Sequence, residues 1–428
     1  MTISQNGSAK GMVHFSEFEL DNGLKVILSK DSSIPSVVIN LCYHVGSKDE
    51  EPDKTGYAHL FEHLMFEGSK NVPPGDYDRL SLLAGGENNA YTNEDKTNYY
   101  IVLPSNQLEF GLWLESDRML EFAVSEEALE TQKGVVIEEK KQMFDNRPYG
   151  SVSLEFAPKL FPISNYRWDT IGEDEHIENA SLSDIRDFYN KFYVPNNVVL
   201  SIVGDIDIED TKNLVNEYFG SIPRGTQLHK QEFRELPLTG ETRKVIHDNI
   251  QLPGLFMGYR IPEETSKEFY TMDILSDILS TGDSSRFYNE LVYEKQIASE
   301  IGCYVDGKEF SGVFYIYAIL MPGRTIEELE TEIDKIFDDV KAGKLLQNEL
   351  QKIKNRIESR NAYRLQTILA KAELLTHYKI FYKDANLINT NIHNYMNINL
   401  EDIKNSTVKF LNKDNRVVLH YLPKPNLN

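Results

Sequence analysis

The chain has 428 residues, more than one hydrophobic core usually serves, so two domains of about 200 residues are expected. Its 45 basic and 67 acidic residues give a net charge of −22, which disfavours non-specific binding to nucleic acid or to an anionic membrane. No apolar run reaches the roughly 18 residues of a membrane-spanning helix, and two cysteines, Cys42 and Cys303, are too few for a disulfide framework or a thiolate zinc site.

The first half of the chain combines short apolar runs with longer amphipathic segments. Asp21-Asn22-Gly23 is a hairpin turn between the first two runs. The periodicity predicts strands at 15–20, 24–29, 37–45, 87–92, 97–103 and 198–203, and helices around residue 60 and at 76–83, 106–120, 126–144, 181–192 and 210–219.

A similar order of elements restarts after residue 241. Residues 223–241 hold proline, glycine and mixed charges with few apolar residues, so they are interpreted as a linker. The repeat predicts an α+β fold of two homologous domains, 1–222 and 242–428, each an antiparallel sheet with helices packed on one face. The elements expected in the second half are strands at 244–247, 254–260, 311–320 and 416–421, and helices at 267–280, 326–341, 347–383 and 400–411.

The most informative motif is the stretch His59-Leu60-Phe61-Glu62-His63. Four residues turn a helix by about 400°, so the two histidines share one face roughly 6 Å apart along the axis. Two imidazoles in this arrangement can bind one zinc ion, and Glu62 reaches a water beside it. The order H-x-x-E-H is the inverzincin signature, and Thr55 is the predicted N-cap of the helix. The alternative is a polar patch or a hydrogen-bonded core cluster.

A third ligand has to come from elsewhere, since catalytic zinc usually has three protein ligands and one open position. In helix 126–144, periodicity places Glu139 on the buried face and turns Glu138 about 100° away. An inward carboxylate needs a partner, and either a zinc ion or a buried salt bridge satisfies it. The predicted buried face consists of Gln132, Val135, Val136, Glu139 and Met143.

Several sequence blocks resemble the pitrilysin and mitochondrial processing peptidase family of inverted zinc peptidases, the relatives of insulin-degrading enzyme. The resemblance covers nearly the whole chain and is nearest to the catalytic subunit of the bacterial two-subunit type. In that family the third ligand lies 76 residues beyond the second histidine, which is Glu139 here. The matching blocks are LDNGLKVIL at 20–28, YHVGSKDE at 43–50, TGYAHLFEHLMFEGS at 55–69, GGENNAYTNEDKTNYY at 85–100, EE at 138–139, TIGEDEHI at 170–177, FYVPNNVVLSIVGDID at 192–207 and RFYNELVYEKQIA at 286–298.

The resemblance implies one Zn²⁺ per chain, held by His59, His63 and Glu139, with Glu62 as the general base that transfers protons during peptide hydrolysis. It implies a substrate-pairing edge strand at 87–92, where Asn89 and Ala90 meet the peptide beside the zinc. The alternative is that the strand at 87–92 is an ordinary sheet edge.

Phe66 resembles the family residue that lines the pocket just past the cleaved bond; otherwise it is a core aromatic. Helix 267–280 takes the place of the motif helix but has no histidine, so the second domain is expected to be non-catalytic.

Two departures from the family pattern stand out. Gln132 occupies the position where many relatives have a glutamate beside the zinc ligands, so a charge is missing. Relatives also carry an Arg and a Tyr in the second domain that contact the substrate carbonyl. Here Tyr293 replaces the Arg, and no Tyr follows until Tyr304. A homologous zinc-less subunit that supplies this pair is therefore the expected partner.

The expected protein is thus the zinc-bearing subunit of a heterodimeric peptidase, a half-clamshell that closes with its partner around a chamber for peptides or unfolded segments. The alternatives are a self-sufficient homodimer and a non-catalytic scaffold subunit, against which the intact motif argues. The first 20 residues show no secretory signal, so a cytoplasmic location is expected, or a periplasmic one if an export signal was removed.

Overall fold

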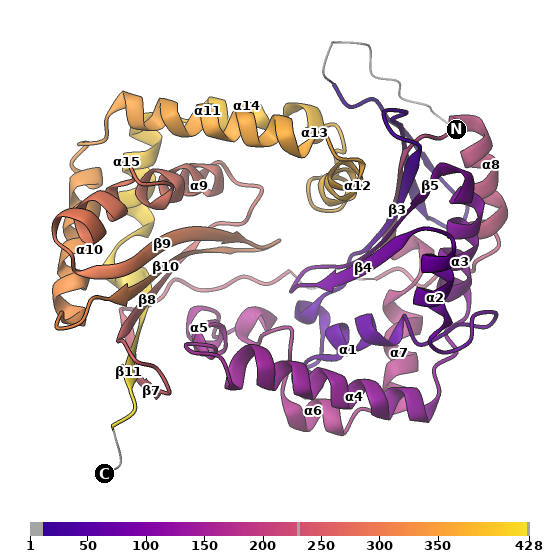
Figure 1. Cartoon of the computed structure of the whole chain (residues 1–428), viewed down its shortest axis with the longest axis horizontal. Helices are drawn as coiled ribbons and strands as arrows, with labels where there is room; N and C mark the ends of the chain where they lie inside the picture. The colour runs from indigo at the N-terminus through magenta and orange to yellow at the C-terminus, as the bar shows by residue number, and fades with distance from the viewer. Residues whose placement is uncertain (1–11, 229–231, 426–428) are drawn as a thin grey trace. The chain divides into compact units, whose positions relative to one another are not determined.

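The computed structural model describes residues 12–228 and 232–425 and forms two compact units (Figure 1). Unit 1 lies within Met1–Glu139, Asp169–Gln231 and Ala362–Thr390, and unit 2 lies within Lys140–Trp168, Glu232–Asn361 and Asn391–Asn428. Each unit combines one sheet with several helices, so the α+β fold class is confirmed. No helix in the described ranges is long and apolar enough to cross a membrane.

The sheet of unit 1 has six strands in the order β1-β2-β6-β3-β5-β4, and β4 is an edge strand. Neighbouring strands are antiparallel except for β2 and β6, which run parallel. The strands are β1 (Ser16–Glu19), β2 (Lys25–Lys30), β3 (Ser36–Tyr43), β4 (Glu87–Thr92), β5 (Thr97–Pro104) and β6 (Val198–Gly204).

The sheet of unit 2 has five strands in the order β7-β11-β8-β10-β9, with β7 and β11 parallel and β9 at the edge. This order matches β2-β6-β3-β5-β4 of unit 1 strand for strand, so the structure shows the duplication that the sequence suggests. The strands are β7 (Thr242–Asp248), β8 (Gly254–Ile261), β9 (Ala298–Gly307), β10 (Gly312–Leu320) and β11 (Arg416–Pro423).

The α-helices are divided between the two units. Unit 1 contains α1 (Tyr57–Leu64), α2 (Asp76–Leu83), α3 (Leu108–Leu120), α4 (Glu126–Lys140), α6 (Asp174–Glu178), α7 (Leu182–Phe192), α8 (Ile208–Phe219), α12 (Ile368–His377) and α13 (Leu387–Thr390). Unit 2 contains α5 (Val152–Leu160), α9 (Lys267–Ser280), α10 (Ile326–Lys341), most of α11 (Gln347–Arg364), α14 (Ile392–Met396) and α15 (Leu400–Phe410).

One face of the unit 1 sheet is covered by α12, a helix from late in the sequence. Ala372 and Leu375 of α12 pack in one cluster with Val38 and Val203 of the sheet. Asn40 in the middle of β3 donates a hydrogen bond of 3.1 Å to the hydroxyl of Thr376. Both faces of β3 and β6 are therefore buried, which explains their nearly continuous apolar sequences.

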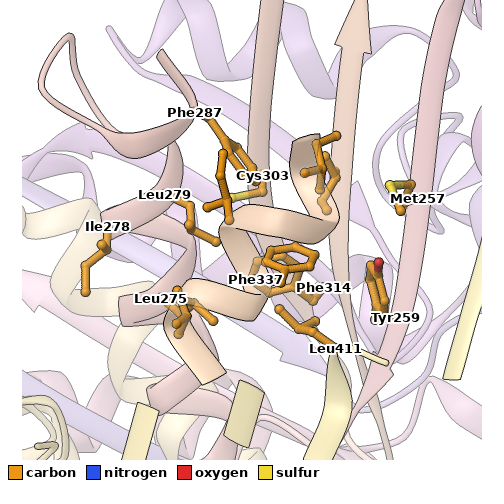
Figure 2. Packing of buried hydrophobic residues seen from close by; sticks show 14 of the residues in the cluster. Met257, Tyr259, Leu275, Ile278, Leu279, Phe287, Cys303, Phe314, Phe337 and Leu411 are labelled. Carbon is orange, nitrogen blue, oxygen red and sulfur yellow. The ribbon is translucent and has the colours of Figure 1, made fainter. Parts of the chain in front are cut away.

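The reciprocal arrangement holds in unit 2, where α5 comes from early in the sequence. Phe156 and Leu160 of α5 pack against Phe256 and Leu419 on one face of the sheet. The other face carries the larger core, in which Leu275 and Leu279 of α9 share a cluster with aromatic side chains such as Phe314 (Figure 2).

These two helices explain where the compact units differ from the predicted contiguous domains 1–222 and 242–428. Residues 140–168 belong to unit 2 and residues 362–390 to unit 1. The single helix predicted at 347–383 is wrong, since α11 ends at Arg364 and α12 begins anew with the Thr367 hydroxyl accepting from the Ala370 amide at 3.2 Å. Strand β9 was not predicted, because its burial pattern is irregular.

Candidate active site

Helix α1 positions the H-x-x-E-H motif beside the edge strand β4 (Figure 1). It begins at Tyr57, after Gly56 in the left-handed region at φ 87°. The buried Glu50 carboxylate accepts hydrogen bonds from the amides of Gly56 at 3.0 Å and Ala58 at 2.7 Å. A carboxylate at this end satisfies free amides and complements the helix dipole.

The predicted N-cap role of Thr55 is wrong. The Thr55 hydroxyl lies 2.8 Å from Nδ1 of His176 and accepts a hydrogen bond from the Glu173 amide. Thr55 therefore ties the segment before α1 to the segment around α6, and Glu50 does the capping from eight residues upstream of Ala58.

The structure brings His59, His63 and Glu139 together. The Nε2 atoms of the two histidines are 3.3 Å apart, and Oε2 of Glu139 lies 3.7 Å from His59 Nε2 and 3.5 Å from His63 Nε2. One ligand atom from each of the three residues falls within 4.8 Å of the others, and the described residues contain no other such group of His, Cys, Asp or Glu.

The donor set suits a zinc ion. Burial, together with the neighbouring His63, lowers the pKa of His59 to about 4, so this imidazole is neutral near pH 7 and keeps a lone pair for a metal. Two imidazole nitrogens and a carboxylate oxygen crowd one point, and a cation between them would relieve the repulsion of their lone pairs. Two nitrogens and one oxygen are also the ligand types of catalytic zinc sites.

Glu62 lies on the same helix and is held by the edge strand. Its Oε2 atom accepts a hydrogen bond of 2.5 Å from the Thr92 hydroxyl, at the end of β4. Burial raises the pKa of Glu62 to about 7, with the charge of Glu139 adding to the rise and the Thr92 bond opposing it. A carboxyl with a pKa near neutrality is suited to general acid–base chemistry.

Gln132 lies on the same face of α4 as Glu139, as the sequence predicts. Its Oε1 atom is 3.2 Å from Nδ1 of His63, the ring nitrogen that points away from the ligand cluster. Nδ1 of His59, by contrast, is buried and has no hydrogen-bond partner among the described residues. The two histidines are thus held differently.

The predicted buried face of α4 is only partly right. Val136 is 1% exposed, but Val135 is 42% exposed, Met143 48%, and the Glu139 side chain 40%. The α-helix also ends at Lys140 and continues as a π-helical turn, Lys141–Asp145. The Glu139 side chain is therefore partly accessible, whereas periodicity alone had suggested a buried position.

Strand β4 is the predicted substrate strand and pairs only with β5 among the described residues. Its Asn88 and Thr92 side chains reach α2 and α1 through Asp78 and Glu62. Ala90 has the same parity and points to the same face, while Asn89 points to the other and accepts a hydrogen bond from the Ala90 amide.

Phe66 follows α1 and packs in an aromatic cluster. Its ring meets Tyr77 edge to face at 5.2 Å, and the Arg118 guanidinium lies 5.4 Å from its centre. Arg118 is buried and bonded to the buried Glu115 at 2.5 Å. The Arg118–Glu115 ion pair therefore holds the guanidinium in place against the half-buried Phe66 ring.

Sequence reasoning missed Glu50, Glu67 and Thr92. Glu50 caps α1, Glu67 accepts a hydrogen bond from Gln132, and Thr92 donates one to Glu62. Each of these residues contacts a partner in another segment or at a sequence separation that is not a regular helix spacing. Local periodicity therefore could not have identified them. The available signal was that all three lie in blocks that resemble the family, with Glu50 in 43–50, Glu67 in 55–69 and Thr92 in 85–100.

Comparison with known proteins identifies the family of the chain. The sequence profile described as "Insulinase (Peptidase family M16)" matches residues 25–156, and "Peptidase M16 inactive domain" matches residues 179–357. A zinc protease named PqqE, from Helicobacter pylori, is 30% identical over 339 residues, which cover 78% of this chain and 76% of that protein. The chain belongs to peptidase family M16. The resemblance inferred from the sequence blocks is thereby confirmed.

Other M16 relatives are similar over most of their length. An uncharacterized zinc protease, YmxG of Bacillus subtilis, is 24% identical over 80% of this chain and 82% of that protein. The structure of a protease from Helicobacter pylori has a TM-score of 0.91 at 26% identity and covers 96% of this chain and 100% of that one. A putative M16-like peptidase from Alicyclobacillus acidocaldarius has a TM-score of 0.80 at 20% identity, with 99% of each chain covered, and shares the fold.

Proposed function

We propose that this M16 chain is a zinc metalloendopeptidase that hydrolyses peptides or unfolded segments. The observation that carries the proposal is the convergence of His59, His63 and Glu139 on one point, with Glu62 on the helix of the two histidines and the edge strand β4 beside it. These three residues would hold a zinc ion, which would supply Lewis-acid chemistry toward the scissile carbonyl and a water molecule.

The remaining chemistry falls to the side chains of the chain itself. Glu62 accepts the proton of the attacking water and later donates it to the leaving amine, a task that matches its pKa of about 7. Thr92 keeps the Glu62 carboxylate oriented. An extended peptide adds to the edge of β4 through its main chain, a mode that allows peptides of different sequence, and Asn89 and Ala90 are the proposed contacts there.

The test begins with the purified chain. It should bind about one zinc ion, cleave an unstructured peptide, lose activity with a chelator and regain it with stoichiometric zinc. A folded chain that binds no zinc, or cleavage that persists without metal, would refute the proposal.

We further propose a partner that completes the site. Tyr293, where relatives carry an Arg, is 72% exposed and offers one hydroxyl donor, whereas a guanidinium offers five donors and a charge. The partner is then a homologous zinc-less subunit that supplies an Arg–Tyr pair and closes a chamber around the peptide. A self-sufficient homodimer and a non-catalytic scaffold are the alternatives.

Losing a cationic donor at a developing oxyanion typically costs about 3–4 kcal/mol. The isolated chain should therefore bind zinc but turn over peptides slowly. Adding the zinc-less homologue should restore turnover and give a 1:1 complex on gel filtration, and an Arg→Ala change in that homologue should abolish the effect. Rapid turnover by the isolated chain would refute the heterodimer and leave the zinc site unaffected.

A further inference from the structure

Beyond the three proposed ligands and Glu62, a further carboxylate, Glu67, is linked to the site through an amide. The Gln132 side chain bridges two groups: its Oε1 lies 3.2 Å from Nδ1 of His63, and its Nε2 donates a hydrogen bond of 2.5 Å to Oε1 of Glu67. All three side chains are partly buried. The two contacts form a continuous chain, Glu67–Gln132–His63.

The direction of this chain follows from chemistry. An ionised carboxylate only accepts hydrogen bonds, so Glu67 must face the NH₂ group of Gln132. The carbonyl oxygen of Gln132 then faces His63, and a carbonyl also only accepts. Nδ1 of His63 must therefore carry the proton, which leaves the lone pair on Nε2, the atom beside Glu139.

Without Glu67, nothing in these contacts would fix the amide. A glutamine rotated by half a turn would present NH₂ to His63 and favour the proton on Nε2, which removes the lone pair that a metal needs. A glutamate at position 132 would not have this ambiguity, because both of its oxygens accept. The carbonyl of Gln132 is held toward His63 only while a group that accepts and does not donate hydrogen bonds contacts the Gln132 NH₂ group.

We propose that Glu67 is a positioning residue that sets the His63 tautomer through Gln132 and so keeps the site ready for zinc. The inference rests on the proposed zinc site and adds to it a residue outside the motif. The inference also explains the charge that seemed to be missing at Gln132. The negative charge is carried by Glu67, which is separated from His63 by the Gln132 side chain.

The test is a double-mutant cycle on the full chain, with zinc affinity measured by competition with a chromophoric chelator. Glu67→Ala should weaken zinc binding about tenfold, within the 10–100-fold range of groups that hold metal ligands. In a Gln132→Glu background the same Glu67→Ala change should cost less than twofold. Glu127→Ala, which removes a charge from an exposed position on α4, is the matched control and should change affinity by less than twofold.

A second readout needs no metal. Nitrogen NMR of the histidine-labelled, zinc-free chain should show His63 protonated on Nδ1, and Glu67→Lys should shift the proton to Nε2, since a lysine donates to the glutamine carbonyl and turns the amide around. Equal losses from Glu67→Ala in both backgrounds, or an unchanged tautomer in Glu67→Lys, would overturn the inference. A chain that binds no zinc at all would refute the proposed function instead, and the NMR result would still decide the tautomer.

Discussion

Units 1 and 2 share a strand order but differ in the helix that follows β3 in unit 1 and β8 in unit 2. In unit 1 this is α1, eight residues long, with polar side chains facing β4. In unit 2 it is α9, fourteen residues long, which packs its apolar side chains into the core shown in Figure 2. One fold therefore carries a candidate metal site in one copy and only a core helix in the other.

The acidic residues of α9 sharpen this contrast. Asp273 and Asp277 are spaced like the two histidines of α1, but Asp273 accepts a hydrogen bond from the Tyr395 hydroxyl at 2.9 Å, and burial raises its pKa. No third ligand of the required type joins them among the described residues. The comparison teaches that helix spacing alone does not make a metal site, because a carboxylate from a second helix must also reach it.

The strongest way to break the comparison is to remove a ligand. His63→Ala and Glu139→Ala should each reduce zinc content from about one per chain to a trace after dialysis, because losing a direct ligand costs more than losing the groups that orient it. Metal analysis of folded protein checks this. His393→Ala, an exposed histidine of unit 2, is the control and should keep full zinc. Full occupancy in Glu139→Ala would show that another carboxylate is the ligand, with Glu138 the next candidate.

The second prediction separates chemistry from metal binding. Glu62→Gln should keep zinc and fold but slow hydrolysis by about 10²–10⁴-fold, the usual contribution of a general acid–base group. Steady-state rates and metal content on the same preparation measure both properties. Activity within threefold of the wild type would rule out proton transfer by Glu62.

The third prediction concerns the hydrogen bond between Glu62 of α1 and Thr92 of the edge strand β4. Thr92→Val removes the hydroxyl that holds Glu62 and should slow hydrolysis about tenfold, since a hydrogen bond to a carboxylate is worth roughly 1.5 kcal/mol. Zinc affinity should stay within twofold. Thr92→Ser keeps the hydroxyl and should behave like the wild type; equal defects in Val and Ser variants would argue for a packing role.

The smallest expected effect on stability concerns the ion pairs of α12 and α5, the helices that each cover one face of a sheet. Lys371 of α12 forms an ion pair with Asp31, and Lys244 of β7 pairs with Glu155 of α5 at 2.7 Å. Lys371→Met should cost about 1 kcal/mol. Lys244→Met should cost less, because Lys159 still pairs with Glu155 at 2.7 Å.

The Asp31 pair also has a defined pH dependence. Burial acts to raise the pKa of Asp31, but the hydrogen bonds from Lys371 and Ser33 outweigh it and lower the pKa from 3.8 to about 2. The pair therefore stabilises the fold above about pH 4 and loses its effect as the pH falls through 2. Thermal midpoints of wild type and Lys371→Met should converge over that window, and a difference that persists below pH 2 would assign the effect to packing.

Local sequence alone determined much of this protein. The spacing of His59, Glu62 and His63 placed them on one helical face, and apolar periodicity gave most strands and helices close to their observed bounds. These features depend on neighbours within one or two turns, so the chain reveals them without a fold. The family resemblance then selected Glu139, which periodicity had left open between a ligand and a buried ion pair.

The tertiary structure decided which segments meet. Only the folded chain shows that α12 covers the first sheet, that Thr92 reaches Glu62, and that Glu67 reaches Gln132. Each of these contacts joins residues at least 30 positions apart, and their geometry is set by strand order and helix docking. Such contacts leave no period in the sequence, because a side chain that bonds to a distant partner looks locally like any other polar residue.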